Sequence, residues 1–234
     1  MGVRVSAVLV ALAVVAAGPG RLAAAAPGPA DSEHPRIFFR AEDLEAGRNL
    51  RGRVALTGSH CEEYALLRRW AEEHLGRPAS AFLSEPDLAQ EAALTYAFLF
   101  QLSGEERFAR RAVELTRALV RSREGRLPGF QWWRLPVTVA LVFDWTYVGL
   151  SPEDRRVLLY DLLKRCIYVH DRKAPPEPRP FDHAAYLKPL LFAVLALEGE
   201  PEASRYVPTW KDYVGRVLTE RVLADLDSAG SRGA

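Results

Sequence analysis

Helical runs of two chemical kinds alternate along the chain, and this alternation constrains the fold more than any other feature. Three runs, EAALTYAFLF, LPVTVALVFDW and AAYLKPLLFAVLAL, are apolar almost all the way round, which is typical of a helix surrounded by protein. The runs that follow the first two, ERFARRAVELTRALVRS and PEDRRVLLYDLLKRCIYV, carry charges on one side, as a water-facing helix does. No convincing alternating strand pattern is found, so the sequence predicts an all-α fold.

Turn and capping signals place the ends of these helices. Ser84, with Asp87 three residues later, has the spacing of a capping box, and Ser151 followed by a proline is a typical helix start. Gly199 is expected to stop the last apolar helix. The expected helices span Glu62–Leu75, Glu85–Leu102, Glu105–Ser122, Trp132–Tyr147, Pro152–Tyr168, Asp182–Leu197 and Glu202–Leu223.

Inner and outer helices in strict succession predict an incomplete α/α toroid built of helical hairpins, with a helical solenoid as the other arrangement of this kind. Ala93, Ala140 and Ala193 occupy corresponding places in the inner helices and recur at about 50 residues, a spacing found in helical-pair arrays. We expect a signal peptide over residues 1–25, an extended segment with a short helix over 26–60, the toroid over 61–226 and a tail over 227–234.

The first residues predict the compartment. Arg4 precedes an apolar run, Val5 to Ala17, and small residues at Ala23 to Ala26 offer cleavage positions, which is the pattern of a secretory signal peptide. The run is about 13 residues long and a bilayer needs ~20, so a permanent anchor is the weaker interpretation. We expect a secreted or periplasmic protein with no membrane attachment after cleavage.

Charge and cysteine content narrow the partners. The formal charge of +1 becomes −1 when Arg4 and Arg21 leave with the signal peptide, so general nucleic-acid binding has no electrostatic basis. Cys61 and Cys166 can pair in an oxidising compartment, or remain as buried free thiols. No metal-ligand cluster or phosphate loop is found, and neither a metal nor a cofactor is expected.

Loop lengths predict where function lies. Links from an inner to an outer helix are short, whereas the links back, SREGRLPGFQ and HDRKAPPEPRP, are long. If the inner helices are parallel, the long links share one rim, at the amino-terminal ends of these helices. Long loops on a rigid scaffold commonly carry binding function.

The residues at the first long link suggest an acidic carbohydrate. Helix amino termini favour anions, Arg134 offers a planar donor fork for a carboxylate, and Trp132 and Trp133 offer flat faces for a sugar ring. Gln131 joins them as a substrate-binding candidate. Paired tryptophans beside an apolar helix also serve as ordinary packing, so both interpretations stay open.

The second long link leads into three titratable residues. His183 and Tyr186 share a helix face and can move protons around a sugar carbon, and Asp182 is either a substrate contact or an N-cap. A structural role for His183 remains the alternative. Asp144, within an apolar run, either contacts substrate or pairs with an arginine of a neighbouring helix.

Three segments resemble the amino-terminal toroid of heparinase II/III-like polysaccharide lyases: HPRIFFRAEDL, SPEDRR after FDWTYVGL, and DHAAYLKPLLFAVLALEGE. The similarity runs from about His34 to Leu226. It implies a secreted or periplasmic protein that cleaves uronate-containing polysaccharides by β-elimination. The family's Asn-Asn-His segment implies a catalytic role for His183, with Phe181 and Asp182 in place of the asparagines.

The expected function is therefore a truncated lyase domain that binds or cleaves an acidic polysaccharide, with His183 and Tyr186 as catalytic candidates. The family's later tyrosine segment and β-sandwich are not matched, so a separate β-sandwich domain or self-association is expected to cover the open end of the toroid. The alternatives are a non-catalytic glycan-binding or scaffold toroid and, more weakly, a glycoside hydrolase that uses Asp182 and Asp144.

Overall fold

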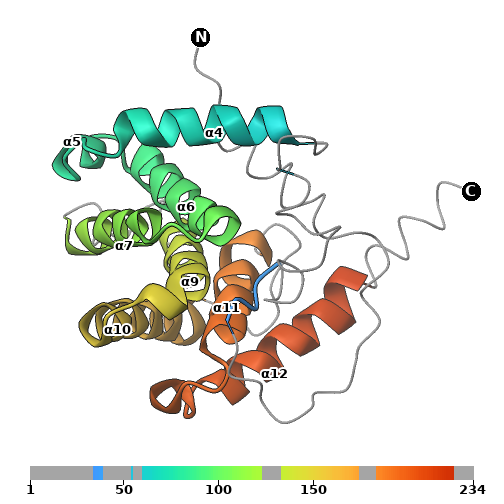
Figure 1. Cartoon of the computed structure of the whole chain (residues 1–234). Helices are drawn as coiled ribbons and strands as arrows, with labels where there is room; N and C mark the ends of the chain where they lie inside the picture. Colours follow the sequence, from blue (N-terminus) through green and yellow to red (C-terminus); the bar gives the residue numbers. More distant parts are fainter. Residues whose placement is uncertain (1–33, 39–53, 55–59, 123–132, 174–182, 224–234) are drawn as a thin grey trace, which may run out of the picture.

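The protein is all-α wherever its structure is described. A computed structural model describes residues 34–38, 54, 60–122, 133–173 and 183–223. Within these ranges every regular element is a helix, which confirms the predicted fold class (Figure 1). The α-helices are α4 Cys61–His74, α5 Ser80–Leu83, α6 Pro86–Ser103, α7 Glu106–Arg121, α9 Arg134–Thr146, α10 Pro152–Tyr168, α11 His183–Leu197 and α12 Val207–Val217.

Short tighter or wider helical turns extend several of these helices. They are the 3-10 turns Tyr147–Gly149 and Pro201–Ala203 and the π-helical turns Val169–Lys173 and Leu218–Leu223. The predicted signal peptide, residues 1–25, and the predicted tail, residues 227–234, lie outside the described residues.

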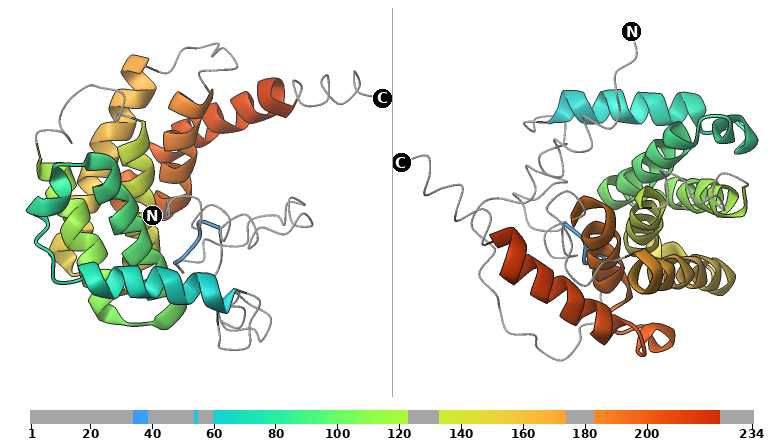
Figure 2. Two further views of the ribbon diagram at one scale, coloured as in Figure 1. Left: turned by 90° about the horizontal axis from the view of Figure 1, so that it is seen from above. Right: turned by 180° about the vertical axis from the view of Figure 1, so that it is seen from behind.

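The helices form two layers. α6, α9 and α11 lie side by side as the inner layer, and α7 and α10 cover them on one side in every view (Figures 1 and 2). α4 packs against α6 at one end of this row, and α12 packs against α11 at the other. From α6 to α11 the helices therefore alternate between layers in the predicted order, while an outer position for α12 and closure into a toroid stay predictions.

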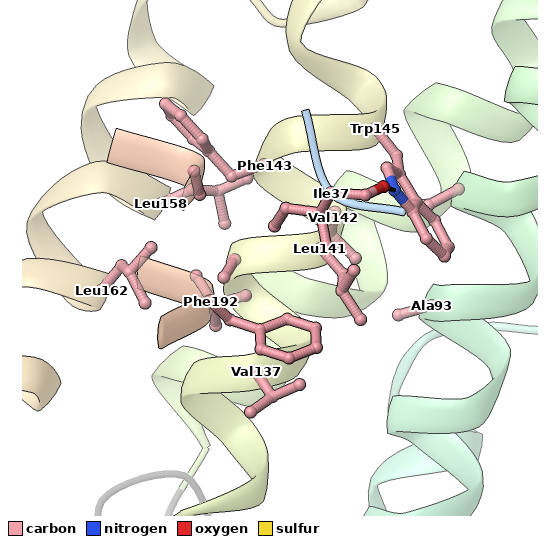
Figure 3. Close-up of a cluster of buried hydrophobic side chains, with 14 of the residues drawn as sticks. Ile37, Ala93, Val137, Leu141, Val142, Phe143, Trp145, Leu158, Leu162 and Phe192 are labelled. Carbon is pink, nitrogen blue, oxygen red and sulfur yellow. Dashed lines mark hydrogen bonds between the residues drawn. The ribbon is translucent and has the colours of Figure 1, made fainter. Parts of the chain in front are cut away.

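Burial follows the two kinds of helix. Every residue of α9 after its first is buried, from Leu135 to Thr146, whereas α7 buries one face and exposes charged residues on the other. Figure 3 shows α9 side chains meeting Leu158 and Leu162 of α10 and Phe192 of α11 in one apolar cluster. An all-round apolar helix has protein on every side, and this is why its sequence tolerates so few charges.

The inner helices α6 and α9 run parallel, as their cross-helix contacts require. Near their amino-terminal ends Arg134 Nη1 lies 2.7 Å from Asp87 Oδ1, and near their carboxyl ends Gln101 donates its side-chain amide to the Trp145 carbonyl. α11 follows the same direction, because Arg36 donates its guanidinium to the Glu198 carbonyl just after α11 while its backbone N–H reaches α9.

Two predicted boundaries need correction. Ser84 does not cap α6: it ends the short helix α5, and α6 begins at Pro86 after Glu85. Proline is well placed in a first turn because its missing N–H would have no partner there. The last helix begins at Val207 instead of Glu202, since the preceding residues form a separate 3-10 turn.

Other predicted boundary signals are confirmed. The Ser151 hydroxyl accepts a hydrogen bond from the Asp154 backbone N–H at 3.1 Å and so caps α10. Gly199, which follows α11, has a φ of 86°, a left-handed conformation that favours glycine.

Both cysteines are free thiols. Cys61 is half-buried on α4, and Cys166 is buried on α10, where its thiol lies 3.9 Å from the Pro189 carbonyl of α11. Burial raises the pKa of the Cys166 thiol, so the group remains protonated and behaves as a small apolar side chain. The free-thiol interpretation therefore describes this structure.

A buried carboxylate fixes the segment before the first described helix to the inner layer. Asp144, only 1% exposed near the end of α9, accepts a hydrogen bond from His34 Nδ1 at 2.6 Å. Its oxygens also accept the backbone N–H groups of Arg36, at 2.9 and 3.0 Å, and Ile37, at 2.9 Å. Trp145 returns a bond from Nε1 to the Ile37 carbonyl at 3.1 Å. Asp144 is thus an attachment point for residues 34–37. Its partners are the His34 ring and backbone N–H groups, and not an arginine side chain of a neighbouring helix, which was one alternative from the sequence.

A second carboxylate flanks the same histidine. Glu200 is buried after α11, and its Oε1 lies 3.9 Å from His34 Nε2, a buried nitrogen with no hydrogen bond among the described residues. Arg155 of α10 pairs with Glu200 and sits 6.0 Å from the ring centroid of Tyr147, on which His34 stacks at 3.9 Å. The His34 ring is therefore enclosed by groups at the carboxyl end of α9, on α10 and just after α11.

Replacing Asp144 by alanine should destabilise the protein strongly. The change leaves the His34 ring and two backbone N–H groups buried without their acceptor, and breaking a buried pair in this way costs about 3–5 kcal/mol. Urea unfolding followed by circular dichroism measures the loss. Asp212→Ala, at an exposed site on α12, is the control and should change stability by less than about 0.5 kcal/mol. Equal effects of the two changes would contradict the role given to Asp144.

Candidate functional site

The amino-terminal ends of three inner helices lie at one end of the layer, where the predicted rim would stand, while most of the two long links that define this rim lies outside the described residues. α6 begins at Pro86, α9 at Arg134 and α11 at His183, and the parallel course of the helices brings these ends to the same side of the layer. Helix amino termini carry partial positive charge and unpaired N–H groups, so three of them on one rim favour an anionic ligand.

Arg134 is held by an ion pair across this rim. Its Nη1 lies 2.7 Å from Oδ1 of Asp87 in the first turn of α6, and the arginine side chain is 32% exposed. The sequence analysis expected a guanidinium aimed at a ligand carboxylate and did not foresee this partner. Because one donor of the fork is used by Asp87, an arriving anion meets an arginine whose position is already fixed.

Lys188 is a second cation of this region, and the sequence analysis missed it as a site residue. It is exposed on α11, and its Nζ lies 5.9 Å from the ring centroid of Phe192 one turn later. Partial desolvation lowers the pKa of Lys188, and the positive charge of Arg134 lowers it further. Arg134 and Lys188 therefore place two positive charges within electrostatic reach on adjacent inner helices.

The remaining predicted residues are only partly described. Trp133 is half-buried at the N-cap position of α9, and Tyr186 is half-buried at the edge of the core. His183 is the first residue of α11, one helical turn before Tyr186. The other candidates, Gln131, Trp132 and Asp182, lie outside the described residues.

Asp144 does not belong to this rim. It stands ten positions after Arg134 in α9, about 15 Å along the helix at 1.5 Å per residue, and its carboxylate is occupied by the segment 34–37. Paired glycosidase carboxylates stand about 5–9.5 Å apart, so the geometry gives no support to a hydrolase that combines Asp144 with a residue at the start of α11.

A strained aromatic residue lies farther along the inner layer. Phe38 has a φ of 69°, in the left-handed region that a non-glycine residue occupies at a cost of about 1–3 kcal/mol. Its ring is 44% exposed and contacts the rings of Trp145, at 6.4 Å between centroids, and Phe192, at 5.6 Å. The sequence signal is the Phe-Phe pair of HPRIFFR, whose first phenylalanine follows the residues attached to Asp144.

The described ranges contain no group of three or more histidine, cysteine, aspartate or glutamate residues arranged to hold a metal ion. None of the helices in these ranges combines the length and apolar character needed to cross a membrane. No protein-family model matches the chain, and no curated protein matches it significantly.

The lowered pKa of Lys188 gives a pH-dependent prediction. A lowered pKa leaves more neutral amine at any pH below the ordinary lysine value of 10.5, and removing the neighbouring positive charge should reverse part of this effect. We expect Arg134→Gln to raise the titration midpoint of Lys188, measured by NMR of 13C-methylated lysines. Arg110→Gln, at an exposed site on α7, should leave the midpoint unchanged. A midpoint insensitive to Arg134→Gln would contradict the proximity of the two charges.

Proposed function

We propose that the chain binds an acidic, uronate-containing polysaccharide at the rim of its inner helices and acts as a heparinase II/III-like lyase domain. The observation that carries the proposal is the placement of Arg134 and Lys188 on neighbouring inner helices at one end of the layer. A polyanion gains from two such cations together with the partial charges of the helix ends. The resemblance to lyases adds the reaction, and we further propose a secreted or periplasmic location from the predicted signal peptide.

The proposed reaction divides among the rim residues. A base removes the proton beside the substrate carboxylate, the electron pair forms a carbon–carbon double bond, and the bond to the leaving glycosidic oxygen breaks while an acid protonates that oxygen. We assign proton transfer to His183 and Tyr186, which begin α11 one turn apart. Arg134 would neutralise the carboxylate, which makes the neighbouring proton easier to remove.

A non-catalytic glycan-binding toroid is the second candidate. The observation that favours it is Tyr186, which is half-buried at the edge of the core and so has limited access to a substrate. Such a protein would use the same cations and the aromatic residues Trp132 and Trp133 to retain a polysaccharide without cleaving it.

An elimination assay separates the two candidates. A lyase releases unsaturated uronate ends that absorb in the ultraviolet, and His183→Ala should reduce this release by about 100-fold or more because it removes the proton-transfer group. Tyr160→Ala, at an exposed site on the outer helix α10, should retain full activity. Retention of hyaluronate, alginate or heparin on the protein without any unsaturated product would favour the binding toroid. If the protein neither releases an unsaturated product nor retains a polysaccharide, both candidates are excluded.

The Arg134–Asp87 pair gives a second test, on affinity. Arg134→Gln should weaken polysaccharide binding by about tenfold, since a charged hydrogen bond contributes about 1.5–3 kcal/mol. Asp87→Asn should strengthen binding, because it frees the guanidinium and removes a negative charge from the rim. Isothermal titration calorimetry measures both.

The control is Lys211→Gln, which removes one positive charge from α12, where Lys211 pairs with Glu198 at 2.6 Å. This change should leave affinity within about twofold of the original, because the site lies away from the rim. If Arg134→Gln and Lys211→Gln weaken binding equally, the attraction is general to the surface and the rim is not the binding site.

A further inference from the structure

The exposed ring of Phe38 is held in place by its neighbours. Residue 37 is buried, and its backbone N–H and carbonyl are bonded to Asp144 and Trp145 of α9. Phe38 therefore follows a residue whose backbone is held in place, and its ring contacts Trp145 on one inner helix and Phe192 on the next. Although it bridges two helices, 44% of the residue remains exposed.

The segment that carries this ring lies on one side of the inner layer. The segment 34–38, blue in Figures 1 and 2, lies on the side of α9 and α11 away from the outer helices α7 and α10. The two rings that Phe38 contacts, Trp145 and Phe192, belong to the buried cluster of Figure 3, whereas 44% of Phe38 itself remains exposed. Its left-handed backbone also makes glycine or asparagine the less strained choice. Core packing thus accounts for the covered part of this residue and gives no reason for its exposed part.

Lys188 places a positive charge next to the Phe192 ring, which Phe38 also contacts. It stands four residues before Phe192, which places it about 6 Å nearer the amino-terminal rim, and its Nζ lies 5.9 Å from the Phe192 ring centroid. Phe38 and Lys188 thus contact the same ring, and both are exposed. An exposed apolar ring and an exposed ammonium group that share Phe192 as a neighbour match a sugar ring that carries an acidic substituent.

We propose that Phe38 and Lys188 form a subsite for one acidic sugar unit, with the C–H face of the sugar ring on Phe38 and its carboxylate or sulfate group on Lys188. This inference rests on the proposed function and extends it, because it places bound polysaccharide along α11 as well as at the rim. The strained backbone at Phe38 is then the cost of presenting a flat apolar face to the ligand.

Binding of defined oligosaccharides to the full chain tests the subsite. Hyaluronate and alginate hexasaccharides are titrated by calorimetry, with cellohexaose as the neutral probe. Phe38→Gly should weaken binding of the acidic probes by about tenfold or more while the melting temperature stays equal or rises, because glycine adopts the left-handed backbone without strain. Phe38→Tyr keeps the flat ring and should bind as the original protein does.

Lys188→Gln should weaken binding of the acidic hexasaccharides by about tenfold, and the loss should shrink in high salt because the contact is electrostatic. The matched controls lie on the outer helix α10: Tyr160→Ala removes an exposed aromatic ring and Lys164→Gln an exposed cation. Both should leave affinity unchanged.

The outcomes separate this inference from the proposed function. If the original protein binds an acidic hexasaccharide but folded Phe38→Gly binds it equally well, the subsite is wrong and the proposed function stands. If Lys188→Gln also binds it equally well, Lys188 has no role in either, and the proposed function then depends on the effect of Arg134→Gln. If the original protein binds neither acidic probe, the proposed function and the subsite both fail. Equal binding of cellohexaose and the acidic probes would also overturn the role given to Lys188.

Discussion

The buried carboxylate of Asp144 is the interaction on which the arrangement of this protein depends. It joins a segment more than a hundred residues earlier in the chain to the end of an inner helix through His34 and two backbone N–H groups. A carboxyl group with so little contact with water is tolerated only when hydrogen-bond partners surround it, and here they do. The attachment fixes residue 37 in the core and so determines where Phe38 emerges.

The inner helices then divide the molecule into regions with different chemistry. Their carboxyl ends hold the Asp144 and Glu200 contacts with His34, which are enclosed and serve attachment. Their amino-terminal ends carry Arg134, fixed by Asp87, and lead to Lys188, which is exposed on α11. Since α6 and α9 are parallel, helix dipoles add to the positive side chains at the same end. Lys188 and Phe38 are thus exposed, whereas the contacts of Asp144 and Glu200 with His34 are enclosed.

Aromatic contacts connect the attachment to the proposed ligand surface. Trp145 follows Asp144 in sequence, donates to the Ile37 carbonyl and also contacts the ring of Phe38. Phe192 of α11 contacts both the ring of Phe38 and the ammonium of Lys188. A change at the enclosed carboxylate would therefore be felt at the exposed ring, because the same short segment carries both. Stability and ligand binding are coupled through residues 34–38.

The sequence by itself determined the all-α class and the alternation of inner and outer helices, because a helix surrounded by protein and a helix facing water need different residues at each turn. It also fixed local features such as the Ser151 cap. Only the tertiary structure decided that Asp144 binds His34, that Arg134 pairs with Asp87, and that Phe38 lies between Trp145 and Phe192. These partners are 47 to 154 positions apart, and periodicity within one helix carries no information about which residue of another helix will face it.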